Sequence, residues 1–93
     1  MKTLRPSTQY KKDLKRIRNN PGKAAALREV LSMLENEIPI PNEYKPHPLT
    51  GDYAGCMECH IEGDFLLIWI DHDDIYLVRL GSHSELFGKG SKR

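Results

Sequence analysis

The spacing of hydrophobic residues predicts two amphipathic helices in the first 36 residues. One face of the first helix carries Tyr10, Leu14 and Ile17. Ser7 or Thr8 can cap its amino end, because a hydroxyl accepts a backbone N–H that has no partner within the helix. The break at residues 19–22 (Asn-Asn-Pro-Gly) separates it from a second helix over residues 23–36, whose inward positions are Leu27, Val30, Leu31 and Leu34.

After Gly51 the pattern becomes that of β-strands. Three segments are apolar and rich in β-branched and aromatic side chains: residues 56–61, 65–70 and 75–80. The short polar stretches between them are expected to be hairpin loops. Four prolines in residues 38–48 predict an extended loop rather than a strand, because proline lacks an N–H donor.

These elements predict an α+β fold in which a short N-terminal strand, over about residues 2–5, precedes a two-helix hairpin packed on an antiparallel sheet of three to four strands. The 93 residues are enough for one domain, 1–93, with a modest core. Residues 88–93 are rich in Gly, Ser and Lys and are expected to fray. No apolar run approaches the roughly 18 residues of a transmembrane helix, and no secretory signal is visible, so a cytoplasmic location without membrane contact is expected.

A strand register follows if residues 62–64 and 71–74 are loops of three and four residues. His60 then opposes Leu66, Glu58 opposes Ile68, and Arg79 also opposes Leu66 from the other neighbouring strand. One face of the sheet would carry Glu58, His60 and Arg79. The other face would be a core against the helices, made of Cys59, Ile61, Phe65, Leu67, Trp69, Tyr76, Val78 and Leu80.

The net charge of +1 conceals an asymmetry between the two parts of the chain. Residues 1–28 contain nine Lys and Arg and a single acid, Asp13, which gives +8, whereas residues 29–93 carry −7. A basic segment of this kind can lie along a nucleic-acid backbone or an acidic partner. A solvated helix surface is the simpler explanation for the same lysines.

Titratable residues gather at the predicted strand ends and loops of the second half. They comprise three histidines, two carboxylates and an arginine: His47, Glu58, His60, Asp64, Arg79 and His83. Histidine titrates near physiological pH and can serve as general acid or base, and the guanidinium fork of arginine suits a charged phosphoryl transition state. The set suits acid–base cleavage of a phosphodiester. His72, between acids in a loop, is expected to be solvated.

Residues 56–60 match the Cys-x-x-Cys-His pattern of c-type haem attachment. Haem attachment needs an export signal, and residues three apart on a strand point to opposite faces. Two cysteines alone are also a poor basis for structural zinc. The simplest expectation is therefore one core cysteine and one surface cysteine.

Three segments in combination resemble the YafQ branch of the RelE-like toxins, which are bacterial type II mRNA interferases. They are His47-Pro48-Leu49-Thr50-Gly51, then Glu58-x-His60-x-x-x-Asp64, then Arg79-x-Gly81-Ser82-His83-Ser84-x-Leu86-Phe87. The resemblance extends from the early helices to Phe87. It implies a RelE-like fold and cleavage of translated mRNA in the ribosomal A site through the ribose 2′-OH.

Carried over by position, the resemblance implies catalytic roles for His47, His60, Asp64 and His83. Arg79 would hold the scissile phosphate and Phe87 would stack on a base. Glu58 stands where relatives commonly have Asp and would support the site. On this basis Asp64 or His47 would be the base and His83 the acid, with His60 and Arg79 on the phosphate and with no metal or cofactor. Four basic residues of the first helix would contact ribosomal RNA: Lys11, Lys12, Lys15 and Arg16.

The partners that the resemblance implies are mRNA, the ribosomal RNA of the 70S ribosome, and a cognate antitoxin of the ribbon-helix-helix type. Operator DNA would be reached only through that antitoxin. Three alternatives stay open: a catalytically inactive RelE-like module that binds antitoxin or RNA, a gyrase-directed toxin of the ParE branch, and a small haem protein. The histidine set argues against the first two, and an absorption spectrum would test the third.

Overall fold

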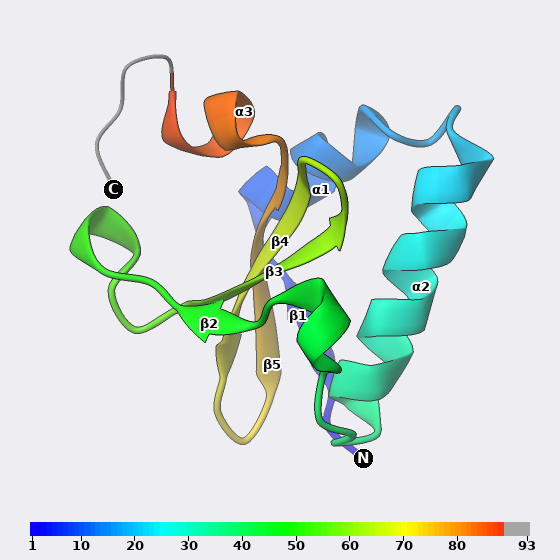
Figure 1. Ribbon diagram of the computed structural model, residues 1–93. Helices are drawn as coiled ribbons and strands as arrows, with labels where there is room; N and C mark the ends of the chain where they lie inside the picture. Colours follow the sequence, from blue (N-terminus) through cyan, green and yellow to red (C-terminus); the bar gives the residue numbers. More distant parts are fainter. Residues whose placement is uncertain (89–93) are drawn as a thin grey trace.

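The computed structural model describes residues 1–88. Its helices are α1 (Thr8–Lys15), α2 (Pro21–Glu35) and α3 (His83–Phe87), with 3₁₀ turns η1 (Asn42–Tyr44) and η2 (Gly51–Tyr53). Its strands are β1 (Leu4–Pro6), β2 (His47–Pro48), β3 (Met57–Glu62), β4 (Phe65–Asp71) and β5 (Ile75–Gly81). The predicted α+β class is confirmed, including the short N-terminal strand and the helical hairpin (Figure 1).

A five-stranded mixed sheet, in the order β1-β5-β4-β3-β2, forms the centre of the molecule. The strands β2, β3, β4 and β5 pair with one another in antiparallel fashion, and β1 pairs in parallel with β5. The loop predicted over residues 38–48 is wrong at its end, where His47 and Pro48 form β2. Pro48 is tolerated there because β2 is an edge strand with one side free of a neighbour.

Two hydrophobic clusters lie on opposite faces of the sheet. The helix-covered cluster joins Leu27, Val30 and Leu34 of α2 to Cys59, Leu67 and Trp69 of the strands. The helices α1 and α2 contact β5 and β3, respectively, and Figure 1 shows α2 running beside the sheet. The second, smaller cluster contains Leu66, Ile68 and Leu86, so α3 packs on the other face.

The inward face of α1 differs from the prediction at one position. Tyr10 and Ile17 are buried as expected, but Leu14 is 39% exposed and Asp13 is 1% exposed. The helix is capped by the Ser7 hydroxyl, which accepts the Tyr10 N–H. A carboxylate therefore occupies the buried position that the hydrophobic spacing assigned to leucine.

The β3–β4 hairpin forms the predicted residue pairs although its turn is one residue shorter than predicted. Glu62 pairs with Phe65, so the connection is the two-residue turn Gly63–Asp64 rather than a three-residue loop. The register shifts by one residue between His60 and Glu62, which compensates for the shorter turn. His60 consequently opposes Leu66, as predicted, and Glu58 opposes Ile68.

The predicted register between β4 and β5 is wrong. Arg79 opposes Ile68 rather than Leu66, and a bulge at Val78 separates this pair from the pair Trp69–Leu77. The extra residue reverses the alternation of side chains along β5. Ile75 and Leu77 are therefore in the helix-covered cluster, whereas Tyr76 is 42% exposed and Val78 packs on the second cluster.

The cysteines point to opposite faces, as predicted, but neither is a surface residue. Cys59 lies in the helix-covered cluster, and Cys56 in the second cluster, and both are free thiols. Burial raises the pKa of Cys59 to about 12. In the described residues no helix is long and apolar enough to cross a membrane. Fraying was predicted for residues 88–93, of which residues 89–93 lie outside the described residues.

Gly81 joins β5 to α3 in a conformation that a side chain would strain. Its φ is +154°, and a Cβ would lie 2.7 Å from Oε1 of Glu85. We expect Gly81→Ala to lower the free energy of unfolding by about 1–3 kcal/mol. Gly22→Ala, whose Cβ would make an ordinary 3.6 Å contact in α2, should instead raise it by about 0.4–1 kcal/mol. Urea unfolding of both variants measures the difference, and equal stabilities would contradict the strain at Gly81.

Candidate functional site

The sheet register brings the predicted site residues into two adjacent rows. In the first row, His47 of β2 opposes Glu58, Glu58 opposes Ile68, and Ile68 opposes Arg79 of β5. In the second row, His60 opposes Leu66, which opposes Gly81 at the end of β5. His47 and Arg79, which are 32 residues apart in the chain, thus lie at the two ends of a row that crosses four neighbouring strands.

Three histidine rings follow one another across this face. The ring centroids of His47 and His60 are 6.1 Å apart, and those of His60 and His83 are 5.8 Å apart. Phe87 continues the series at 6.0 Å from His83. We call these four side chains the histidine row. The predicted catalytic histidines and the predicted base-stacking residue are therefore brought together.

Asp64 holds His83 at the start of α3. Its Oδ1 lies 2.7 Å from Nδ1 of His83 and accepts the His83 backbone N–H at 3.1 Å. The hydrogen bond with the His83 ring, followed by the one from its backbone N–H, keeps the pKa of Asp64 below its usual value. The turn Gly63–Asp64 and the start of α3 are in this way joined through one carboxylate.

His47 meets an oxygen acceptor at each ring nitrogen. Its Nε2 lies 3.0 Å from Oε1 of Glu58, whose carboxylate is fully buried, and its Nδ1 lies 2.7 Å from the Lys45 carbonyl. A neutral imidazole has one N–H, so only the doubly protonated ring donates to both oxygens. Lys45 adopts a positive φ of 51° just before β2, which turns its carbonyl toward His47.

Arg79 is held by a buried carboxylate that sequence reasoning did not assign to the site. Asp13 accepts from Arg79 Nε at 2.8 Å and from Nη2 at 3.2 Å, and its Oδ2 also accepts the Leu80 N–H at 3.0 Å. Burial is the largest influence on the pKa of Asp13 and raises it, but the hydrogen bonds from Arg79 and Leu80 and the nearby positive charges outweigh it and leave the pKa lowered. The hydrogen bond to Asp13 raises the pKa of Arg79.

Tyr53 of η2 is a second residue missed by the sequence reasoning. Its hydroxyl accepts from Arg79 Nη1 at 3.4 Å and donates to the Leu86 carbonyl at 3.3 Å, and its ring meets Phe87 edge-on at 5.4 Å. Tyr53 thus connects the arginine to α3. The position of Tyr53 in a loop gave no indication of this contact. Asp13 could have been noticed, because it is the single acid in residues 1–28, which also contain nine basic residues.

The basic residues of α1 fall into two groups. Lys11, Lys12 and Lys15 are exposed on the helix surface. Arg16, also exposed, lies 3.2 Å from Asp13 Oδ1 and 3.8 Å from Glu85 Oε2. Glu85 in turn completes the capping box of α3 by accepting the Ser82 N–H. Arg16 therefore bridges α1 and α3 rather than only facing solvent.

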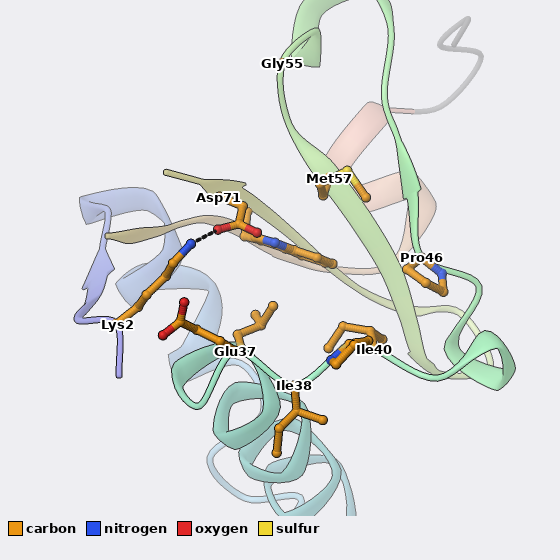
Figure 2. A pocket seen from close by; sticks show the side chains of 11 residues that line it. Lys2, Glu37, Ile38, Ile40, Pro46, Gly55, Met57 and Asp71 are labelled. Atoms are coloured by element: carbon orange, nitrogen blue, oxygen red, sulfur yellow. Dashed lines mark hydrogen bonds and ion pairs between the residues drawn. The ribbon is translucent and has the colours of Figure 1, made fainter. Parts of the chain in front are cut away.

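A separate pocket of about 590 Å³ lies between the segment after α2 and the strands β3 and β4 (Figure 2). Its lining includes Ile38, Ile40 and Met57, and the ion pair between Lys2 and Asp71, at 2.6 Å, lies at its edge. None of the predicted site residues lines it. Within residues 1–88, no group of three or more His, Cys, Asp or Glu side chains is arranged to hold a metal ion.

A short strand, two helices and a sheet that carries a histidine row on the face against which α3 packs are the features expected of a RelE-like toxin. The chain belongs to the family of bacterial YafQ toxins of type II toxin–antitoxin systems, whose sequence model matches residues 2–88.

Relatives of known name or structure support this assignment. The mRNA interferase toxin YafQ of Escherichia coli K12 is 36% identical over 84 residues, which cover 88% of this chain and 91% of that protein. The toxin of the E. coli DinJ–YafQ toxin–antitoxin crystal structure is 34% identical with a TM-score of 0.83, covering 94% of this chain and 98% of that one. A metal-bound toxin from Helicobacter pylori is 40% identical with a TM-score of 0.84, covering 94% of this chain and all of that one.

The contact between Asp64 and His83 can be tested by titration. We expect His83→Ala to raise the pKa of Asp64 toward its usual value, because the ring hydrogen bond is lost while the backbone N–H remains. Since the folded-state pKa is lowered, the contact stabilises the fold fully above the ordinary Asp range and is lost as the pH falls through the folded-state pKa. Carbon-detected NMR of the Asp64 carboxyl measures this shift. His72→Ala is the matched control, and an unchanged Asp64 pKa in His83→Ala would contradict the contact.

Proposed function

We propose that this chain is an mRNA interferase that cuts translated mRNA by acid–base attack of the ribose 2′-OH on the adjacent phosphate. The observation that carries the proposal is the histidine row, in which three imidazoles lie about 6 Å apart on the face of the sheet against which α3 packs. This spacing allows two imidazoles to reach the two sides of one phosphate group. The family membership and the name of the E. coli relative support the choice of RNA as substrate.

His83 is the proposed general acid. Its Nδ1 faces the Asp64 carboxylate at 2.7 Å, so this nitrogen carries the proton and Nε2 is left for the substrate. When protonated, Nε2 can donate to the 5′-oxygen leaving group. Asp64 supports this role by fixing the ring, in the way that a carboxylate orients a catalytic histidine in other hydrolases. Its lowered pKa makes Asp64 a weak base and favours this positioning role over the alternative of general base.

His60 is the proposed general base. It lies between His47 and His83, within about 6 Å of both rings, whereas His47 directs both of its nitrogens to protein oxygens. Because both nitrogens of His47 already face protein oxygens, neither is left free to accept the 2′-OH proton. His47 lines the phosphate site instead, with Glu58 holding its ring. This distribution differs from the sequence-based expectation, in which Asp64 or His47 is the base and His60 binds the phosphate.

Arg79 and Phe87 complete the proposed site. The guanidinium stabilises the charge that develops on the phosphoryl oxygens, which is a large term in such reactions. Phe87, next to His83 in the row, offers an aromatic surface for a base beside the cut. We infer that the mRNA is presented in the ribosomal A site, with α1 lying on ribosomal RNA. A cognate antitoxin of the ribbon-helix-helix type, which alone contacts operator DNA, restrains the toxin in the cytoplasm.

The proposal predicts that cleavage depends on His83. Induced expression of the unsubstituted chain should arrest growth and create new mRNA 5′ ends inside translated codons, mapped by primer extension. His83→Ala should lose both effects, with cleavage falling by roughly 10²–10⁴-fold, the usual contribution of a general acid. His72→Ala is the matched control, because His72 is exposed in the β4–β5 loop and should leave cleavage unchanged.

Other outcomes of this experiment would overturn the proposal. Growth arrest without new 5′ ends would indicate a gyrase-type target, and absence of arrest from a folded protein would indicate an inactive binding module. The chemistry proposed needs no metal, so toxin stripped by chelator should cleave as well as toxin loaded with zinc or copper. Both samples should be assayed on programmed ribosomes in the same magnesium buffer. A requirement for the loaded metal would replace the acid–base mechanism with a metal-assisted one.

The exposed lysines of α1 give a further prediction about ribosome binding. Exchanging Lys11, Lys12 and Lys15 for Gln should weaken binding and make the dependence of log affinity on log salt shallower, by about one unit per lost phosphate contact. The chemical step should be unchanged once the complex is saturated. Lys2→Gln removes a lysine that pairs with Asp71 and is the control. An unchanged salt slope in the triple variant would exclude α1 from the RNA interface.

A further inference from the structure

The buried carboxylate of Asp13 lies against Arg79 and has no part in the proposed chemistry. It belongs to α1, on the helix-covered side, and its side chain has no exposed surface. Four N–H donors converge on it from Arg79, Leu80 and Arg16. A carboxylate buried at this depth is costly unless it is fully paired, so its position is set by these partners and sets theirs in turn.

The hydrogen bonds leave a defined part of the arginine available. A guanidinium has five N–H donors in a fixed plane. Nε and Nη2 each give one hydrogen bond to Asp13, and Nη1 gives one to Tyr53. Two donors, one on each Nη, remain. A phosphate group can accept hydrogen bonds from both Nη atoms of one arginine.

We propose that Asp13 is a positioning residue: it holds the plane of Arg79 so that the two remaining Nη donors face the scissile phosphate beside the histidine row. The inference rests on the proposed function and adds to it the residue that orients the phosphate-binding group. Arg16 and Glu85 extend the arrangement, because Arg16 lies 3.2 Å from Asp13 and 3.8 Å from Glu85 of the α3 capping box. Arg79 contacts Asp13 directly, and α3, the helix that carries His83, is linked to Asp13 through Arg16 and Glu85.

The competing interpretation is that Asp13 is a counter-ion that substrate must displace. Burial argues against displacement, since the carboxylate would be left without Arg79 and with only the Leu80 and Arg16 donors. The Leu80 N–H also fixes Asp13 to the backbone of β5 at 3.0 Å. An immobile carboxylate orients its partner, whereas a mobile one would compete with the phosphate.

The first test is a double-mutant cycle on programmed ribosomes. Asp13→Asn keeps the shape of the side chain and removes its charge, and it should lower kcat roughly 10- to 100-fold with little change in KM, as expected for a misplaced catalytic group. Arg79→Gln should also lower kcat, and the kcat of the double variant should be no lower than that of Arg79→Gln. Asp73→Asn, in the β4–β5 loop, is the matched control. Losses that multiply in the double variant, or an unchanged kcat in Asp13→Asn, would overturn the proposal.

The second test uses the unsubstituted protein and needs neither a folded variant nor cleavage. Nitrogen-15 NMR of the Arg79 guanidinium is followed as inorganic phosphate is added, and then a short RNA with a 2′-deoxyribose at the cut. The Nη signals should shift while the Nε–H signal stays in place, because Nε remains on Asp13. A moved Nε–H signal would identify Asp13 as a displaced counter-ion, and unmoved Nη signals would remove Arg79 from phosphate binding. Failure of mRNA cleavage by the unsubstituted chain would overturn the proposed function alone.

Discussion

The contact between Asp13 and β5 is the interaction on which the arrangement of this molecule depends. The strand β1 pairs with β5 only from Ile75 to Leu77, so beyond that point β5 has a neighbouring strand only on its other edge, where β4 continues to Gly81. The Asp13 carboxylate takes the place of a strand there by accepting the Leu80 N–H. The same carboxylate receives Arg79 and Arg16. One buried acid thus caps this edge of the sheet, contacts β5 from α1 and holds a guanidinium in place.

The histidine row follows from the strand pairing and from the way α3 starts. The pairs His47–Glu58 and His60–Leu66 place two imidazoles on neighbouring strands. The third, His83, comes from α3, whose start is fixed by the Ser82–Glu85 capping box and by Asp64. Each histidine is therefore oriented by backbone geometry or by a carboxylate. Sites built on such elements hold their geometry better than sites on loops.

Much of this fold could be predicted from the chain because its local signals agree with each other. The helix spacing, the Ser7 cap and the alternating strands each indicated the element that forms, and the Glu58–Ile68 and His60–Leu66 pairs were predicted correctly. The bulge at Val78 was not predictable, because Tyr76 and Val78 are as suitable for a core as Ile75 and Leu77. The packing of the whole sheet against the helices decides which of these two pairs of side chains is buried. A short segment of sequence does not contain that information.

The sequence indicated many of the side chains that the structure brings together in the candidate site, whose roles remain predictions, but it did not indicate their partners. Its histidines, Asp64, Arg79 and Phe87 carry a recognisable spacing along the chain. Asp13 and Tyr53 form hydrogen bonds with Arg79 from positions 66 and 26 residues away. An acid on the inner side of a helix looks like an error in a hydrophobic pattern until its partner is known. Long-range polar pairing of this kind is invisible to periodicity, which records only which face a residue occupies.

The 66-residue separation of Asp13 and Arg79 has a consequence for how the protein is made. Arg79, His83 and Phe87 follow Asp13 by 66 residues or more, so they leave the ribosome well after α1 during synthesis. Until they emerge, α1 has no strand to dock against, and the histidine row lacks its third member. A growing chain that has not yet reached Phe87 therefore carries α1 and its first two histidines without the contacts that bring the candidate site together.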